Sequence, residues 1–135
     1  MVYLVDDDAS VRRAAARLVR STGLEARAFA SGEELLAEVG PDSRGCLVAD
    51  VKMPGMGGLE LLVELRARGV CLPAIVVTAF DTDQTRAQAR QAGAVEYFRK
   101  PVDGHALLDA IRWALDRDTD GAAPQPRGPE SGDCP

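Results

Sequence analysis

Short apolar runs alternate with helical patterns along most of this 135-residue chain. Runs rich in Val, Ile and Leu are typical of strands that are covered on both faces of a parallel sheet. Because a helical pattern follows each run, the order of elements predicts an α/β domain with helices on both faces of the sheet. The predicted strands are Val2–Val5, a weaker Leu24–Phe29, Leu47–Val51, Ala74–Thr78 and Val95–Phe98.

The helices are predicted from apolar residues at helical spacing and from their end signals. The first pattern runs from Val11 to Val19 and is followed by Gly23, which is placed to end it. The second begins at Ser31 with a capping-box sequence and extends to Val39. The remaining helices are predicted over Leu59–Leu65, Thr82–Ala92 and Leu107–Leu115.

The chain is predicted to hold one domain over residues 1–117, followed by a tail over 118–135. The tail contains four of the eight prolines and three glycines, a composition typical of a flexible segment or the start of a linker.

Composition argues against several classes of function. The net charge is −5, whereas a free-standing nucleic-acid binder is usually basic, so direct nucleic-acid binding is not expected. No apolar stretch reaches the roughly 20 residues of a membrane span, and the N-terminus lacks the pattern of a secretory signal. The three cysteines (Cys46, Cys71 and Cys134) show no metal-site spacing. Cys46 and Cys71 are expected to be buried thiols, and a cytoplasmic location is expected.

Carboxylates follow two of the predicted strands. Asp6 and Asp7 come directly after the first strand, and Asp50 lies near the end of the third. In an open parallel sheet, ligands bind beyond the carboxyl ends of the strands, where the strand order reverses. Clustered carboxylates repel one another unless a cation neutralises them, and Mg²⁺ prefers oxygen ligands. These residues therefore predict a Mg²⁺ site at this edge of the sheet.

Two further polar residues end the later strands. Thr78 ends the fourth run, and Lys100 follows the fifth. A hydroxyl and an ammonium group at this edge could hold the oxygens of a transferring phosphoryl group, with a carboxylate as its nucleophile. Each of these residues alone is more often a cap, a turn residue or a solvated side chain. Their shared position at the same strand ends favours the functional interpretation.

The chain resembles the receiver domains of two-component response regulators over residues 2–117. Its spacing of acidic, Thr and Lys positions is most similar to the nitrogen-fixation (FixJ-type) regulators. The matching segments are Val5-Asp6-Asp7-Asp8, Asp50-Val51-Lys52-Met53-Pro54-Gly55-Met56-Gly57-Gly58, Val77-Thr78-Ala79 and Tyr97-Phe98-Arg99-Lys100-Pro101. The resemblance implies a flavodoxin-like (βα)5 fold, doubly wound, with a parallel five-stranded sheet of strand order 2-1-3-4-5.

The resemblance also implies a role for each matching residue. Asp50 is the phosphoacceptor. Mg²⁺ is bound by Asp7 directly, by Asp6 largely through water, and by Asp50 and the backbone carbonyl of Lys52. Thr78 and Lys100 bind the phosphoryl oxygens, and Thr78 and Tyr97 are the switch residues. The peptide bond between Lys100 and Pro101 is expected to be cis.

By the same resemblance, the phosphoryl donor is a sensor histidine kinase. The output is expected at the face built by the fourth helix, fifth strand and fifth helix, which pairs two receivers in the family. Charges of both signs on this face predict a symmetric polar homodimer. The alternative is that they belong to solvated helix faces. The charged residues are Asp81, Asp83, Arg86, Arg90, Arg99, Asp103, Asp109 and Arg112.

Four residues near the motifs have separate interpretations. Asp8 is expected to cap the first helix rather than to bind metal. His105, the only histidine, is expected to be solvated. Lys52 and Phe80 lie two residues after Asp50 and Thr78, at positions that tune phosphate lifetime in the family. The bulk of Phe80 is expected to shield the acyl phosphate from water.

Two other functions remain open. One is a receiver-like interaction module that binds a partner without phosphate. The other is a Mg²⁺-dependent phosphatase with an Asp nucleophile. That class usually carries its nucleophile on the first strand, and no pocket for a small substrate is indicated, so the chain is not expected to be an enzyme. The tail is either the stub of a linker to an effector domain, as the FixJ-like spacing favours, or the end of a single-domain regulator. The expected output is regulation of transcription through such an effector.

Overall fold

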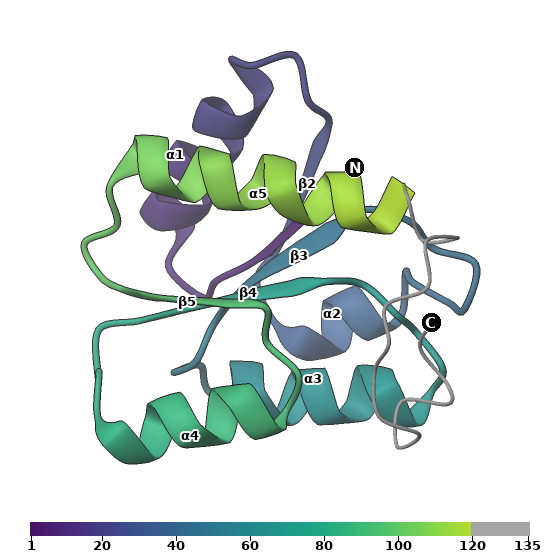
Figure 1. Ribbon diagram of the computed structural model, residues 1–135, viewed down its shortest axis with the longest axis vertical. Helices are drawn as coiled ribbons and strands as arrows, with labels where there is room; N and C mark the ends of the chain where they lie inside the picture. Colours follow the sequence, from purple (N-terminus) through teal and green to yellow (C-terminus); the bar gives the residue numbers. More distant parts are fainter. Residues whose placement is uncertain (120–135) are drawn as a thin grey trace.

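A computed structural model describes residues 1–119, in which five strands and five helices alternate (Figure 1). The strands are β1 (Val2–Val5), β2 (Ala26–Phe29), β3 (Cys46–Asp50), β4 (Ala74–Thr78) and β5 (Glu96–Arg99). The helices are α1 (Ala9–Arg20), α2 (Gly32–Leu36), α3 (Gly58–Ala67), α4 (Asp83–Gln91) and α5 (Gly104–Thr119).

The five strands form one parallel sheet in the order β2-β1-β3-β4-β5. This confirms the predicted doubly wound fold and its strand order. The order reverses between β1 and β3, where Val5 pairs in register with Ala49. On the other side of β3, Asp50 pairs with Val77. The ends of β1, β3 and β4 therefore lie at one edge of the sheet, which is where ligands bind in such folds.

Helices cover both faces of the sheet, with α1 and α5 on one face and α2, α3 and α4 on the other (Figure 1). Alternate residues of the central strands point to opposite faces, so each strand contributes to two cores. In β1, Val2 and Leu4 pack with α1 and α5, whereas Tyr3 and Val5 pack with α2 and α3. This double burial explains why the central strands are continuous apolar runs.

The helix ends follow the expected capping chemistry, with two differences in length. Asp8 caps α1 as predicted, since its carboxylate accepts from the backbone N–H groups of Ser10 and Val11. Ser31 caps α2, but this helix ends at Leu36 rather than near Val39. Conversely, α5 continues to Thr119, two residues past the predicted end of the domain.

The predicted tail lies mainly outside the described residues. Its first two residues form the end of α5, and residues 120–135, Cys134 among them, are not described. Cys46 is fully buried as expected, whereas Cys71 is only partly buried. Within residues 1–119, none of the helices has the length and hydrophobicity needed to cross a bilayer.

Candidate functional site

Three carboxylates meet beyond the ends of β1 and β3. Oxygens of Asp6, Asp7 and Asp50 all lie within 4.8 Å of one another. Asp6 and Asp50 are each only 6% exposed, whereas Asp7 is open to solvent. The two buried acids come from neighbouring strands, so the strand order itself brings them together. This is the acidic cluster that the sequence predicted at this edge.

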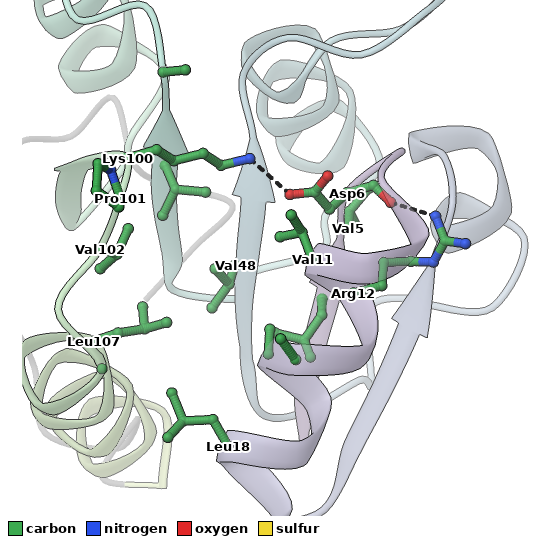
Figure 2. A pocket seen from close by; sticks show the side chains of 16 residues that line it. Val5, Asp6, Val11, Arg12, Leu18, Val48, Lys100, Pro101, Val102 and Leu107 are labelled. Atoms are coloured by element: carbon green, nitrogen blue, oxygen red, sulfur yellow. Dashed lines mark hydrogen bonds and ion pairs between the residues drawn. The ribbon is translucent and has the colours of Figure 1, made fainter.

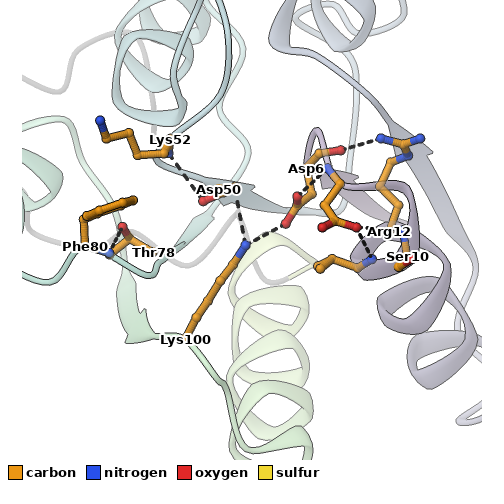
Figure 3. Close-up of polar contacts among 10 residues, drawn as sticks. Asp6, Ser10, Arg12, Asp50, Lys52, Thr78, Phe80 and Lys100 are labelled. Atoms are coloured by element: carbon orange, nitrogen blue, oxygen red, sulfur yellow. Dashed lines mark hydrogen bonds and ion pairs between the residues drawn. The ribbon is translucent and has the colours of Figure 1, made fainter.

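Lys100 extends from the end of β5 into the acidic cluster (Figure 3). Its Nζ lies 2.9 Å from Oδ2 of Asp6 and 3.3 Å from Oδ2 of Asp50. The lysine thus forms an ion pair with both buried acids at once. Because it starts from the far edge strand, its side chain joins the ends of β1, β3 and β5 into one site.

Burial and neighbouring charges shift the pKa values of both Asp50 and Lys100. Burial raises the pKa of Asp50, and the nearby Asp6 adds to the rise, while Lys100 acts to lower it. For Lys100, partial burial acts to lower the pKa, but the hydrogen bond to Asp6 and the charges of Asp50 and Asp6 outweigh it and raise the pKa. The ammonium group is therefore held in its charged form beside an acid whose proton affinity is increased.

The backbone at the end of β3 packs closely against the start of α3. Oδ1 of Asp50 lies 3.4 Å from the backbone N–H of Lys52, a long hydrogen bond. A Cβ atom added at Gly58 would lie only 2.3 Å from the carbonyl oxygen of Asp50, and one at Gly57 only 2.7 Å from that of Val51. The start of α3 can therefore pack directly against the end of β3 because these two residues lack side chains.

Thr78 is fully buried at the end of β4, and its Oγ1 accepts a hydrogen bond of 2.9 Å from the backbone N–H of Phe80. The Phe80 ring is 59% exposed, and the ammonium of Lys52 lies 5.0 Å from its centroid (Figure 3). The side chains of Lys52 and Phe80, which lie two residues after Asp50 and Thr78, therefore contact each other. The sequence does not predict this contact, because no motif links the two positions.

Asp6 is fixed by two further contacts. Its Oδ1 accepts from the backbone N–H of Asp8 at 2.9 Å, and its carbonyl oxygen accepts from the Arg12 guanidinium at 2.7 Å. Both carboxylate oxygens of Asp6 are thus hydrogen-bonded within the chain, one to Asp8 and the other to Lys100. Arg12 was missed as a site residue, because an arginine on a helix is usually a solvated side chain and no motif marks it.

Tyr97 lies on β5 and contacts α4 and the loop that precedes it. Its hydroxyl donates to Oδ1 of Asp81 at 3.2 Å, and the Arg86 guanidinium lies 5.1 Å from its ring centroid. Arg86 also forms an ion pair with Asp81 at 2.7 Å. Tyr97 thus contacts Asp81 and Arg86, beside the loop that follows Thr78.

A largely apolar cavity of about 650 Å³ opens next to the acidic cluster (Figure 2). It lies between α1 and the segment from Lys100 to Leu107, and its polar lining residues are Asp6, Arg12 and Lys100. The sequence did not indicate a pocket here, because its lining comes from two helices and three strands that are far apart along the chain.

The structure also tests two other predictions made for the segment after β5. The peptide bond between Lys100 and Pro101 is cis. His105 lies in the first turn of α5 and is exposed, away from the contacts described above.

The chemistry of the donor set fits Mg²⁺. Asp6, Asp7 and Asp50 supply only oxygen ligands, which a hard divalent cation prefers. With Lys100 counted, the four side chains carry two more negative charges than positive ones. A divalent cation would balance this excess, so the acidic cluster could bind a metal ion.

The fold and the site define a doubly wound α/β domain with a lysine-paired acidic cluster at the carboxyl edge of its parallel sheet. The family profile of the response regulator receiver domain matches residues 2–112. The chain belongs to this family, and is related to transcriptional regulators.

Curated relatives and solved structures agree with this assignment. Nodulation protein W of Bradyrhizobium diazoefficiens is 40% identical over 118 residues, which cover 87% of this chain and 52% of that protein. The transcriptional regulatory protein FixJ of Azorhizobium caulinodans is 40% identical over 116 residues, covering 86% and 55%. The chain thus spans about half the length of these relatives.

Among solved structures, FixJ-N is 35% identical with a TM-score of 0.78, and the match covers 85% of this chain and 92% of that one. The response regulator StyR is 39% identical with a TM-score of 0.83, over 88% and 60% of the two chains.

Proposed function

We propose that this receiver domain accepts a phosphoryl group on Asp50 from a sensor histidine kinase, in a Mg²⁺-dependent reaction, and thereby changes its α4-β5-α5 face. One observation carries the proposal. A buried carboxylate at the end of β3 lies 3.3 Å from a charged lysine and within 4.8 Å of two further acids. Such a carboxylate has a cation of the chain beside it and two further oxygen ligands for a metal ion close by.

The reaction follows from the chemistry of these groups. An oxygen of ionised Asp50 attacks phosphorus, the bond from phosphorus to the donor nitrogen of a phosphohistidine breaks, and an aspartyl phosphate forms. Lys100 stabilises the negative charge on the phosphoryl oxygens, since its ammonium group already lies beside Asp50. The Thr78 hydroxyl, whose oxygen accepts from Phe80, retains its proton for donation to a phosphoryl oxygen.

Mg²⁺ would be held by Asp7, Asp50 and the Lys52 carbonyl oxygen, with Asp6 acting through water, and it would neutralise charge on the phosphoryl oxygens during transfer. The indirect role of Asp6 is supported by its hydrogen bonds, since each of its carboxylate oxygens is held at 2.9 Å, whereas the corresponding contacts of Asp50 are longer, at 3.3 Å and 3.4 Å. The chain is itself the acceptor in this reaction, so we propose that it acts as a signalling protein and not as an enzyme.

Phosphorylation adds charge and acceptor oxygens beside Thr78, which biases a two-state equilibrium involving Tyr97. The proposed output is a polar homodimer through the α4-β5-α5 face, and regulation of transcription through an effector domain. That effector is suggested by the relatives, which are about twice as long as this chain and include a transcriptional regulatory protein. We place the protein in the cytoplasm and expect no direct nucleic-acid binding by this domain.

The test is intact mass spectrometry after incubation with acetyl phosphate and Mg²⁺. We expect the parent chain to gain one phosphoryl group, and Asp50→Asn to gain none. EDTA should prevent the gain in the parent. Asp42→Asn, at an exposed acid outside the cluster, is the matched control and should be modified like the parent. A folded parent that gains no mass would refute the proposal and favour an interaction module that works without phosphate.

A further inference from the structure

Asp81, Arg86 and Tyr97 form a closed triad of contacts. Asp81 accepts two hydrogen bonds from Arg86, from Nε to Oδ1 and from an Nη to Oδ2, each 2.7 Å long. The Tyr97 hydroxyl donates to the same Oδ1, and the Arg86 guanidinium covers the Tyr97 ring. Each of the three side chains therefore contacts the other two. We refer to them below as the tyrosine triad.

The tyrosine triad is joined to Thr78 through a very short piece of backbone. Asp81 lies three residues after Thr78, in the loop between β4 and α4. Within that loop, the N–H of Phe80 is bound to Oγ1 of Thr78. The loop is thus tied to Thr78 at one end and to Tyr97 at the other. A movement of Thr78 toward a group on Asp50 would shift Asp81 and loosen its contact with Tyr97.

We propose that Asp81 and Arg86 are positioning residues for Tyr97, which hold its side chain against α4 in the unphosphorylated chain and release it when the loop after Thr78 moves. This inference rests on the proposed function, in which Thr78 and Tyr97 are the switch residues. A contact that exists in only one of two conformations shifts the equilibrium toward that conformation. The tyrosine triad would therefore set how much of the resting chain already has the phosphorylated conformation.

The strength of these contacts suits such a role. A bidentate pair between arginine and carboxylate fixes the plane of the guanidinium, which here lies over the ring. Exposed ion pairs and cation–π contacts each change an equilibrium constant by a small factor, and multiplied together here they give about threefold to tenfold. A bias of this size holds the tyrosine at rest and is still overcome by phosphorylation.

The experiment follows Tyr97 with fluorine NMR in fluorotyrosine-labelled full-length chain. The sequence has two tyrosines, and the buried Tyr3 serves as an internal reference. Arg86→Ala should move the Tyr97 signal of the unphosphorylated chain toward its position in the parent loaded with beryllofluoride. It should also speed phosphorylation by acetyl phosphate about threefold to tenfold, by the same estimate. Arg86→Lys, which keeps the charge but not the bidentate geometry, should give an intermediate rate.

Arg90→Ala is the matched control, because it removes an exposed arginine from the same helix. The inference is overturned if Arg86→Ala leaves the phosphorylation rate at the parent value, or if Arg90→Ala raises it equally. A parent chain that takes no phosphoryl group would refute the proposed function instead. In that case, the role of the tyrosine triad is tested only by the fluorine signal of the unphosphorylated chain. An identical Tyr97 signal in Arg86→Ala and in the parent would overturn that role.

Discussion

The Nζ of Lys100, beyond the end of β5, lies 3.3 Å from Oδ2 of Asp50, at the end of β3. The same nitrogen also pairs with Asp6 at 2.9 Å. The Asp50 carboxylate therefore already has a cation of the chain beside it. This internal cation partly neutralises the acidic cluster, so it competes electrostatically with any metal ion that binds there.

Removal of the lysine charge should change metal binding and phosphorylation in opposite directions. We expect Lys100→Met to bind Mg²⁺ about tenfold more tightly, because a positive charge a few ångströms from the carboxylates is lost. Phosphorylation by acetyl phosphate should fall about a hundredfold, since a group that stabilises the transferring oxygens is gone. Calorimetric Mg²⁺ titration and intact mass measure the two effects. Lys52→Met, which removes a charge beside Phe80, controls for net charge, and equal Mg²⁺ affinity in both variants would contradict the prediction.

The Asp81 carboxyl group should titrate at a lower pH than an ordinary aspartate. The hydrogen bond from Arg86 holds the pKa of Asp81 below its ordinary value, and the bond from Tyr97 adds to this. A lowered folded-state pKa stabilises the fold above the unfolded-state pKa of about 4, and this contribution is lost as the pH falls through the folded-state pKa. Carbon NMR titration of the carboxyl group gives the value. Arg86→Ala should raise it toward the ordinary range, and an unchanged value would show that the ion pair is not formed in solution.

Substitution of Gly58 should destabilise the domain. The Cβ of Gly58→Ala would lie 2.3 Å from the carbonyl oxygen of Asp50, so the strand end or α3 must move. Overpacking of this kind costs about 1–3 kcal/mol of unfolding free energy, and here it would also displace Asp50. Gly104→Ala is the control, because its Cβ would meet Leu18 at an ordinary 3.5 Å. Urea unfolding of both variants tests the difference, which should be absent if the backbone contact is not tight.

Phe80 should affect how long the phosphoryl group survives. Its ring is more than half exposed and lies against the ammonium group of Lys52, two residues after Asp50. We expect Phe80→Ala to hydrolyse its aspartyl phosphate several-fold faster, because a group that limits the access of water is removed. Phe80→Tyr keeps the ring and should behave like the parent. The rate of mass loss after removal of acetyl phosphate decides the matter, and an unchanged rate in Phe80→Ala would exclude shielding.

The sequence predicted the central sheet better than its margins. β1 and β4 have their predicted bounds, because both are buried on both faces and their apolar runs end at polar residues. The predicted Leu24–Phe29 strand starts only at Ala26, as β2 is an edge strand with two exposed residues. α2 ends early, since the chain turns at Ala37 ahead of Gly40 and Pro41, while Val39 still packs on the core.

The sequence likewise predicts one part of the candidate site and not the other. The acidic cluster and Lys100 could be placed from sequence, because the strand order alone brings strand ends together. The contacts of Arg12, Asp81 and Arg86 could not be predicted in this way. They depend on the rotamers of long side chains and on the path of one loop, which leave no periodic signal in the sequence. Asp81 and Arg86 were recognised only as charges on the proposed output face.

The position of β5 at the margin of the sheet limits how two copies of this domain can join. β5 pairs only with β4 in the described chain, so one side of its backbone lacks a strand partner. Its first and last residues, Glu96 and Arg99, are exposed and charged. Charged edge strands disfavour the addition of a strand from another molecule. A dimer through this margin should therefore form between side chains of α4, β5 and α5, leaving two separate five-stranded sheets rather than one continuous ten-stranded sheet.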